Sequence, residues 1–467
     1  MRVSLEADML SGKRLVWSLA NLPFNFFILL LLIVTSVDGA ELRAFPGAEG
    51  FGAVSIGGQG GKVIKVTNLK TEGEGSLQAA CEVEGPRIVV FETAGVIRGD
   101  VTIKHSYITI AGQTAPSPGI TIEGRIFSRP EDGSRLHDII IRFLRIRPPP
   151  TTGHNGDAIQ LPNTERVILD HLSLSWANDE MIDICHSSEF TVQWCTIEES
   201  DPEGHGKGIP HNFAIISTYP KSGNISIHHN LFAHHSRRSP SLSPYVPGKP
   251  GDFRNNVVYD FHQGLTHDGH TPKSAINFIG NYYKRGPSSK KIYPFVFHKA
   301  GEYYLEGNFV EGVGEIRDPR DRGIKYPPWM EFNPDGEKLP RPAVVSPVTT
   351  HTAKEAYRRV LSESGSFPRD RVTKRTIQEV MDGTGKWARN APANPSDEWF
   401  LEGLARKKAP LDSEGDGIPD AWEDAHGLNK MDGRDHRKVM PSGYSSIEEY
   451  INERAIILIR EGRTTVP

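Results

Sequence analysis

The sequence predicts an all-β protein, a right-handed parallel β-helix with a small additional module at its C-terminus. Three observations predict the solenoid. The chain holds 46 glycines and 34 prolines among 467 residues, a composition that favours strands and turns over long helices. Between residues 100 and 310, short β-branched segments recur, each followed by a polar turn. Their period of roughly 25 residues is typical of solenoids in which one coil stacks on the next.

Aligning the segments by their apolar pattern places one residue of each repeat in a common column. The aligned residues are Leu144, Leu172, Cys195, Asn230, Asn256, Asn281 and Asn308, with successive differences of 28, 23, 35, 26, 25 and 27. Equivalent positions on neighbouring coils stand about 4.8 Å apart. We therefore expect the four asparagines to stack as a structural ladder in which each side-chain amide bonds the next.

The charge of the chain argues against one class of function. With 54 basic and 58 acidic residues the net charge is −4. A nucleic-acid-binding protein would be basic, with its charge clustered. An acidic substrate would have to meet a local cationic site here, because no global positive field exists to attract it.

Residues 1–39 are interpreted as a signal peptide. Lys13 and Arg14 precede an apolar run that starts at Phe26, and small residues follow up to Gly39. Cleavage there would leave a secreted protein, extracellular or periplasmic, with no membrane span. The alternative is an uncleaved membrane anchor, for which the apolar run is short.

Cys81, Cys185 and Cys195 are an odd number of cysteines for an exported protein. One pair could form a disulfide. The favoured alternative is three free, buried thiols that pack as small hydrophobes. Their spacing does not match a metal site.

The segment from Gly156 to Ile184 carries carboxylates at a coil-like spacing. Asp157 and Asp179 are 22 residues apart, and Asp183 follows four residues later. Coil stacking would bring the three carboxylates to one face, where they would repel one another unless a cation held them. Oxygen-only ligation favours Ca²⁺ over zinc. The alternative is that these aspartates cap turns.

The chain resembles the pectate lyases of polysaccharide lyase family one, of the bacterial secreted type, over roughly residues 44–310, and more loosely to about 385. The motifs are Asp170-His171, Ser175-Trp176, Asp179-Glu180, Ile182-Asp183-Ile184, His228-His229-Asn230-Leu231-Phe232 and Arg238-Ser239-Pro240. The resemblance implies a parallel β-helix, polygalacturonate as the substrate, and Ca²⁺ between enzyme and substrate carboxylates. By motif position it implies that Asp157, Asp179 and Asp183 are the calcium ligands.

The resemblance also implies two basic catalytic residues. Arg238 resembles the catalytic arginine of an Arg-x-Pro motif, and Lys207 resembles the lysine that contacts the substrate carboxylate. The implied reaction is β-elimination across C4–C5 of a uronate, with Arg238 as the base, which gives unsaturated oligouronides. Fixed positive charge would meet the developing enediolate.

The chain departs from the family pattern after Arg238. Related lyases carry a further arginine three or five residues later, where this chain has Ser241 and Ser243. Lys249 or Arg254 could supply the missing cation.

Two histidine-containing motifs are not assigned to chemistry. Asp170 and His171 are neighbours on a strand and should face opposite sides, and the resemblance implies that the pair is structural. The pairs His228-His229 and His234-His235 suggest zinc. However, strand neighbours diverge, and no carboxylate or cysteine stands at a ligand-like spacing.

Residues 412–423 fit a twelve-residue EF-hand-type calcium loop. Oxygen ligands fall at positions 1, 3, 5, 7, 9 and 12, and Gly417 stands at the sharp turn of position 6. The predicted ligands are Asp412, Glu414, Asp416, Ile418 through its carbonyl, Asp420 and Glu423. The loop resembles the calcium-binding repeats that end many exported bacterial enzymes. The alternative is an acidic turn without a metal.

Composition divides the chain into four parts. After the signal peptide, residues 40–310 form the predicted β-helix, 311–400 a Pro-rich loop and helical tail packed on it, and 401–467 the calcium-binding module. We expect the helical tail to close the hydrophobic end of the coil stack. The mature protein is expected to be a monomer.

Two other functions stay open. A polygalacturonase-like hydrolase shares the β-helix fold, and Gly204-His205-Gly206 is reminiscent of a motif in that group. The adjacent aspartate pair and the Arg-x-Lys of that group are not seen, and inverting hydrolysis needs two carboxylates about 6.5–9.5 Å apart. The second is a non-catalytic glycan-binding or adhesive β-helix, for which Ser241 and Ser243 are the best evidence.

Overall fold

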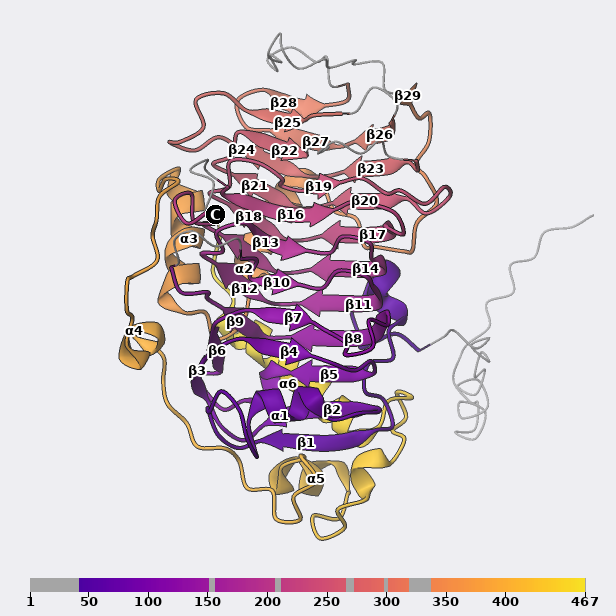
Figure 1. Cartoon of the computed structure of the whole chain (residues 1–467), viewed down its shortest axis with the longest axis vertical. Coiled ribbons are helices and arrows are strands. Elements are labelled where there is room, and N and C mark those ends of the chain that lie inside the picture. The colour runs from indigo at the N-terminus through magenta and orange to yellow at the C-terminus, as the bar shows by residue number, and fades with distance from the viewer. Residues whose placement is uncertain are drawn as a thin grey trace, which may run out of the picture. The chain divides into compact units, whose positions relative to one another are not determined.

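Three stacked sheets wind around one hydrophobic core (Figure 1). The structure is a computed structural model that describes residues 42–150, 156–205, 211–265, 273–297, 301–318 and 337–466. From β2 (Arg87–Phe91) to β19 (Ser241–Leu242), each coil contributes one strand to the first sheet, then one to the second and one to the third. Neighbouring strands within a sheet pair in parallel, so the predicted parallel β-helix is confirmed.

The strands of the first sheet are, in spatial order, β1 (Lys62–Val66), β2 (Arg87–Phe91), β5 (Ile108–Ala111), β8 (Leu136–Arg142), β11 (Thr164–Asp170), β14 (Ser188–Gln193), β17 (Gly223–His228), β20 (Gly251–Arg254), β23 (Ile276–Ile279), β26 (Glu302–Glu306) and β29 (Glu337–Lys338). The second sheet contains β3 (Gly95–Arg98), β6 (Ile120–Glu123), β9 (Leu144–Ile146), β12 (Ser173–Ser175), β15 (Thr196–Glu198), β18 (Leu231–Ala233), β21 (Val257–Tyr259), β24 (Tyr282–Lys284), β27 (Asn308–Val310) and β28 (Gly314–Ile316). The third sheet contains β4 (Val101–Ile103), β7 (Ile126–Ser128), β10 (Ile159–Gln160), β13 (Glu180–Asp183), β16 (Phe213–Ser217) and β19 (Ser241–Leu242). A separate pair consists of β22 (Gln263–Leu265) and β25 (Tyr293–Phe295), and β28 pairs antiparallel with β27.

The core consists of side chains that repeat from coil to coil. One register column of the first sheet reads Val89, Ile110, Ile141, Leu169, Val192, Ile227, Phe253, Phe278 and Leu305, all buried. Burial of each such side chain is worth about 1.5–3 kcal/mol. The apolar column therefore fixes which face of every coil points inward.

The predicted asparagine ladder is present beside this core. Asn230, Asn256, Asn281 and Asn308 are completely buried. The Oδ1 atom of Asn256 accepts hydrogen bonds from the backbone N–H (3.0 Å) and the side-chain amide (3.1 Å) of Asn230. Asn281 does the same for Asn256, and Asn308 for Asn281. The ladder thus satisfies backbone groups at the corner where each coil bends from the first sheet to the second.

The residues that precede Leu144, Leu172, Cys195 and Asn230, which share one column with the ladder, adopt a left-handed conformation. Phe143, His171, Trp194 and His229 have φ between 51° and 56°, and their rings stack on the outside of the corner, with His171 4.8 Å from Phe143. Because His171 is not extended, its Nδ1 lies 2.9 Å from Oδ1 of Asp170. The expectation that these two side chains face opposite sides is therefore wrong. The same bend places the Nδ1 atoms of His228 and His229 3.0 Å apart.

Helices α2 (Ala353–Glu363) and α3 (Arg371–Asp382) lie along the second sheet. Helix α2 contacts β21, β24 and β27, and α3 contacts β15. We expected this segment to close the end of the coil stack; it instead covers the side of the solenoid, because its apolar residues pack on outward residues of the second sheet. The buried carboxylate of Asp370, which caps α3, lies 3.1 Å from the guanidinium of Arg147 and anchors the helix there.

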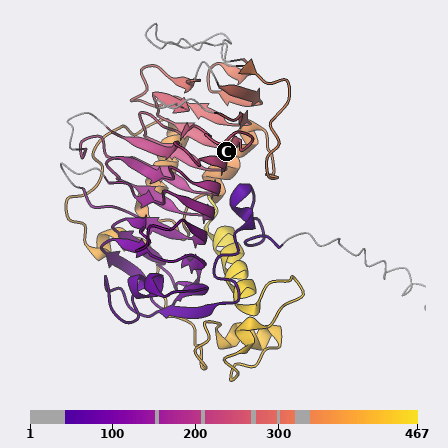
Figure 2. The same cartoon turned by 45° about the vertical axis from the view of Figure 1, so that its right-hand side comes forward.

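The C-terminal residues pack on the outer face of the first coils (Figure 2). This part holds α5 (Asp420–His426), the short helix η4 (Asp435–Arg437) and α6 (Ser446–Gly462). Ile418 and Ile447 contact Ile88 and Val90 of β2. Residues 42–467 form one compact unit. The boundaries predicted at 310 and 400 stay predictions.

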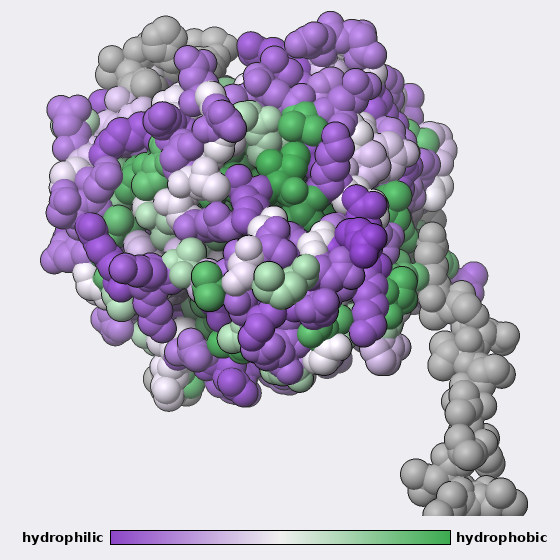
Figure 3. Space-filling view, turned by 90° about the horizontal axis from the view of Figure 1, so that it is seen from below, coloured by the Kyte–Doolittle hydropathy of each residue, from purple (hydrophilic) through white to green (hydrophobic). Residues whose placement is uncertain are grey.

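Four short helices complete the described elements: η2 (Phe51–Val54), α1 (Leu77–Glu82), η3 (Gly112–Thr114) and α4 (Asp397–Leu401). Helix α1 contacts β1 and β4, and its Leu77 and Cys81 extend the core at the N-terminal end of the stack. Seen from that end, the surface is mostly hydrophilic, with hydrophobic residues gathered in a recess (Figure 3). Strand β1 itself is only partly covered, since Val66 is its one fully buried residue.

The three cysteines are free and buried, as the favoured interpretation predicts. Burial raises the pKa of all three thiols, that of Cys81 to about 12. The predicted signal peptide lies outside the described residues. Among the residues that are described, no helix combines the length and the apolarity needed to cross a bilayer.

A buried histidine joins α3 to the bend after β18. His234 Nδ1 lies 2.9 Å from Oδ2 of Asp260, and its Nε2 lies 3.2 Å from Oε2 of Glu379 on α3. Burial alone would lower the pKa of His234, but the two carboxylates outweigh it and raise that pKa to about 9. The imidazolium is therefore the stable form at neutral pH.

Shortening a rung of the ladder tests its contribution to stability. In Asn256→Ala, the backbone N–H of Asn230 and the carbonyl of Ile227 lose their partners in the interior. The free energy of unfolding should fall by about 3 kcal/mol, measured by urea denaturation. The exposed Asn429→Ala should change it by less than about 0.5 kcal/mol. Equal stability of both variants would contradict the ladder.

The His234 site predicts a loss of stability at alkaline pH. Because the folded pKa is raised from about 6.5 to about 9, this stabilisation is complete below pH 6.5 and is lost as the pH rises through 9. Between pH 6 and pH 10, the wild type should lose about 3 kcal/mol more than His234→Gln. Urea denaturation across this range measures the difference, with His186→Gln as the surface control. Parallel pH profiles for wild type and His234→Gln would contradict the assignment.

Candidate active site

The predicted carboxylates meet on the third sheet. Asp157 lies two residues before the start of β10, Asp179 immediately precedes β13, and Asp183 is the last residue of β13. Ile159 pairs with Ile182, so the offset between these coils is 182 − 159 = 23 residues. Asp157 therefore stands opposite Glu180, whose backbone N–H donates to Oδ1 of Asp157 at 2.9 Å.

This register changes the composition of the carboxylate cluster. Asp157, Asp179 and Glu180 each offer a carboxylate oxygen, and these oxygens lie within 4.8 Å of one another. Asp183 is not part of this group, because it lies at the opposite end of β13, where its Oδ1 accepts the N–H of Cys185 at 2.8 Å. Sequence spacing misses Glu180. Asp183 is still near enough for its charge to raise the pKa of Asp157 more than the charge of Asp179 does, and its predicted role as a calcium ligand stays a prediction. Only the one-residue difference in register reveals Glu180 as a neighbour of Asp157.

The cluster is electrostatically unfavourable without a cation. Burial, followed by the charges of Asp183 and Asp179, raises the pKa of Asp157 well above its usual range. Burial likewise raises the pKa of Asp183. A divalent-cation site made only of oxygen ligands brings carboxylates close together, and they repel one another when the cation is absent. The raised pKa of Asp157 is what such a site is expected to show.

Arg238 contacts this cluster from two coils further on. It precedes β19 with φ of 57°, forms an ion pair with Glu180, and its guanidinium carbon lies 4.4 Å from the ring centroid of Phe213. The carboxylate and the aromatic face hold the guanidinium at the edge of the cluster. Lys207 lies outside the described residues, so its predicted place beside Arg238 stays a prediction.

Neither proposed substitute for the missing arginine lies in this site. Arg254 is paired with Asp252 on the first sheet, and Lys249 lies 3.5 Å from Glu189 of the first sheet. A different cation is near the cluster: the charge of Arg125 lowers the pKa of Asp157. It directly precedes β7, whose Ile126 pairs with Ile159, so the coil register could have identified it.

Two histidines also border the cluster. His205 is buried, with Nε2 3.8 Å from Oδ2 of Asp179. The His205 and His211 rings stack at 3.6 Å. The sequence singles out His205 only as part of a hydrolase-like tripeptide, and His211 not at all.

The C-terminal loop forms a second carboxylate cluster. Its members are Glu414, Asp416, Glu423 and Asp435, whose ligand oxygens lie within 4.8 Å of one another. Asp435 comes from η4 and was not predicted. Two predicted ligands are used elsewhere: Asp412 accepts the N–H of Gly415 and of Gly417, and Asp420 accepts the N–H and the O–H of Ser413. The carbonyl of Ile418 belongs to the same loop, and its N–H donates to Asp416.

This second cluster is buried and lacks donors. Both carboxylate oxygens of Glu414 and of Glu423 have no hydrogen-bond partner among the described residues. Burial and then Glu414 raise the pKa of Glu423 to about 8, and burial raises the pKa of Asp416 to about 6. Orphaned buried carboxylate oxygens aimed at one another fit a cation with oxygen ligands.

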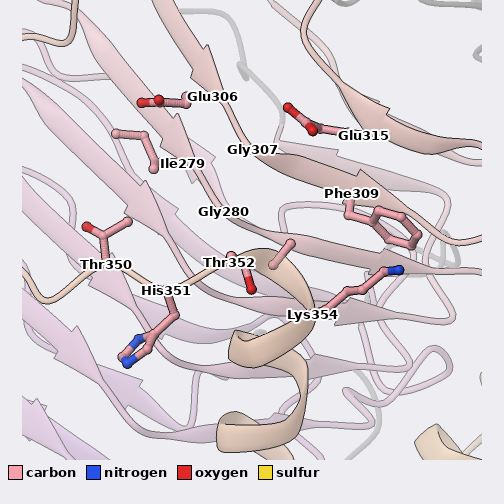
Figure 4. A pocket seen from close by; sticks show the side chains of 11 residues that line it. Ile279, Gly280, Glu306, Gly307, Phe309, Glu315, Thr350, His351, Thr352 and Lys354 are labelled. Carbon is pink, nitrogen blue, oxygen red and sulfur yellow. The ribbon is translucent and has the colours of Figure 1, made fainter.

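Two cavities lie on the solenoid surface. One of about 610 Å³ borders the third-sheet cluster and is lined by Arg98, Arg125, Trp176 and Asn178. The other, of about 690 Å³, lies around Gly280 and Gly307 (Figure 4). These two glycines occupy the left-handed corner position that carries a ring in earlier coils, so no side chain fills the space there. Neither cavity is lined by a residue that the sequence predicts for the site. The first is lined by Gly156 and Asn178, which precede Asp157 and Asp179, and by Arg125, so it is the one that extends the candidate site.

No family model matches the chain. A protein of Aspergillus terreus named "Probable pectate lyase C" is 34% identical over 426 residues, which cover 88% of this chain and 94% of that protein. Its namesake from Emericella nidulans is 32% identical over 450 residues, covering 94% and 98%. Among solved structures, a pectate lyase from a Bacillus species in complex with trigalacturonate is 15% identical, covers 68% of this chain and 98% of that one, and has a TM-score of 0.42, too low to support an inference.

The C-terminal cluster predicts opposite effects of one substitution with and without a cation. In protein stripped of divalent cations, the raised pKa of Glu423 means that stability falls as the pH rises from about 4.5 to about 8. Glu423→Gln should then raise the melting temperature at pH 9 and leave it nearly unchanged at pH 4. With Ca²⁺ added, the wild type should gain more stability than the variant, in which only the third-sheet cluster is left to bind the ion. Differential scanning calorimetry measures both; an identical gain from Ca²⁺ in the variant would contradict the site.

Proposed function

Since the chain belongs to the pectate lyase family and is a polysaccharide lyase, we propose that it cleaves polygalacturonate by Ca²⁺-dependent β-elimination. The observation that carries this proposal is the buried carboxylate cluster of the third sheet with Arg238 in direct contact. The relatives reported above are fungal. The predicted bacterial type stays a prediction.

The donor set supports Ca²⁺ as the cation. Asp157, Asp179 and Glu180 supply only oxygen, which hard cations such as Ca²⁺ prefer. Asp183 adds negative charge close by without itself joining the group. When bound, Ca²⁺ would withdraw charge from a uronate carboxylate and so acidify the proton on C5.

The residues of the chain would then perform an elimination. The proton leaves C5, the C4–C5 double bond forms, and the C4–O bond breaks, so that the leaving sugar keeps its oxygen and takes up a proton from water. The role of base at C5 is assigned to Arg238 by its place in the Arg-x-Pro motif. Arg238, held by Glu180 and Phe213, would accept the C5 proton in its neutral form and so become positively charged beside the developing enediolate, and such electrostatic stabilisation usually lowers the barrier more than any other single effect. The charge of Arg125 also acts on this site, since it lowers the pKa of Asp157.

The alternatives have less support. The ligand oxygens of Asp157, Asp179 and Glu180 lie within 4.8 Å, closer than the about 6.5–9.5 Å that inverting hydrolysis requires. The non-catalytic alternative relies on Ser241 and Ser243, which are buried, whereas Arg238 supplies the cation in the site.

We also propose that the C-terminal cluster binds Ca²⁺ in a structural role. Glu414, Asp416, Glu423 and Asp435 lie at the base of the segment that packs on β2. A cation there would remove the repulsion that raises the pKa of Glu423. The protein would act outside the cell, where the signal peptide would send it and where its polymeric substrate is found.

The role of Arg238 is tested with a neighbouring arginine as the control. Arg238→Lys should lower kcat on polygalacturonate about 10³-fold, equivalent to about 4 kcal/mol, because lysine lacks the planar fork. Arg237→Lys should stay within about threefold, since Arg237 is exposed and bonds Gln263. Ultraviolet absorbance of the unsaturated product measures the rate.

The same assay tests the cation. Chelation should abolish turnover, Ca²⁺ should restore it, and Asp157→Asn should remain inactive in excess Ca²⁺ while retaining the β-sheet circular dichroism. Reducing sugar released without any unsaturated product would show that the reaction is hydrolysis.

A further inference from the structure

Asp179 takes part in two groups of side chains. One is the oxygen cluster with Asp157 and Glu180, and the other consists of Asp179 with His205 and His211. In the second group the carboxylate oxygen and the two imidazole nitrogens lie within 4.8 Å of one another. The side chain of Asp179 is about one-fifth exposed, so its carboxylate is open to both groups.

The scaffold holds the histidine group against the oxygen cluster. The side-chain amide of Asn178 accepts the N–H of Gly156 at 2.8 Å and donates to the carbonyl of Gly204 at 3.2 Å. One amide thus ties the residue before Asp157 to the residue before His205. The ring of His211 lies 4.7 Å from that of Phe213, the same ring that supports Arg238.

The donors of this group differ in kind from those of the oxygen cluster. Two imidazoles and one carboxylate suit divalent transition metals, whereas Ca²⁺ selects oxygen. Three protein ligands also leave coordination positions open, as catalytic metal sites do. We propose that Asp179, His205 and His211 form a binding site for a divalent transition-metal ion, separate from the calcium site and sharing Asp179 with it.

The proposal does not rest on the reaction. Stacked histidines beside a carboxylate could instead pair only with each other, or bind a uronate when substrate is present. Neither alternative creates affinity for a transition metal in the absence of substrate. Metal binding by the resting protein therefore separates them.

The test titrates Co²⁺ into full-length protein stripped of metals, by isothermal titration calorimetry and by visible absorption. Glu423→Gln serves as the background, so that the C-terminal cluster contributes little. We expect one Co²⁺ per chain with a ligand-field band. His205→Ala and His211→Ala should each weaken binding by at least about 100-fold, because even the loss of a group that only orients a metal ligand costs about 10–100-fold.

His186→Ala is the matched control, since His186 bonds Pro220 and stacks on Tyr219 away from the site. It should bind Co²⁺ like the parent. Absence of Co²⁺ binding, or equal binding by the His205 and His211 variants, would overturn the proposal. Should those variants misfold, crystals of the parent grown with Co²⁺ decide: an anomalous peak among the three side chains is expected, and a peak elsewhere overturns it. Loss of lyase activity alone would leave this result unaffected.

Discussion

Parallel pairing between successive coils is the constraint on which the other features depend. It sets each side chain about 4.8 Å from its equivalents above and below, so any residue type that recurs becomes a column. Apolar columns become the core, the asparagine column becomes a hydrogen-bonded ladder, and the left-handed corner column becomes a stack of rings. The same geometry concentrates charge. Asp157 and Glu180 are brought together because their strands are in register.

Repulsion between like charges in one column cannot be reduced by separating the side chains, because the strand register fixes their spacing. The structure shows different resolutions of this problem. At Asp170, the guanidinium of Arg142 and the imidazole of His171 surround the carboxylate and, despite its burial, lower its pKa. At Asp157, Arg125 and Arg238 offset only part of the repulsion, and the pKa is raised. A buried carboxylate that is fully paired with cationic side chains stabilises the fold, whereas one whose charge is only partly offset favours the binding of a cation. This contrast distinguishes residues that look alike in the sequence.

Much of the fold and part of the site could be predicted from the sequence. The ladder was predictable because Asn230, Asn256 and Asn281 recur at nearly constant spacing within regular strands. The Asp170–His171 contact was not, because left-handed bends in non-glycine residues leave no periodic signal. Spacing placed Asp157 beside Asp179, but the true offset of 23 residues also brings Glu180 opposite Asp157, which the spacing of the aspartates alone did not indicate.

Other site residues come from places where no period operates. His205 and His211 lie in the long connection between β15 and β16, inside the repeat whose length rises to 35 residues. Asp435 comes from η4, twelve residues after the loop it completes. Such residues are found only when the tertiary structure brings them to a site. The EF-hand pattern pointed to the loop that holds three of the four clustered carboxylates. It could not show that Asp412 and Asp420 accept hydrogen bonds within the turn, and their predicted ligand roles stay predictions.

The packing of α6 and Ile418 on β2 has a consequence for how the molecule is made. Ile88 and Val90 leave the ribosome well before Ile447 and Ile451, which cover them and follow some 360 residues later (447 − 88 = 359). At about 5–20 residues per second, the interval is roughly 20 to 70 seconds. During that time the first coil presents an uncovered apolar strand face, the kind of surface that chaperones bind and that nascent chains aggregate through. Synthesis of α6, rather than of any one coil, is what ends this exposure.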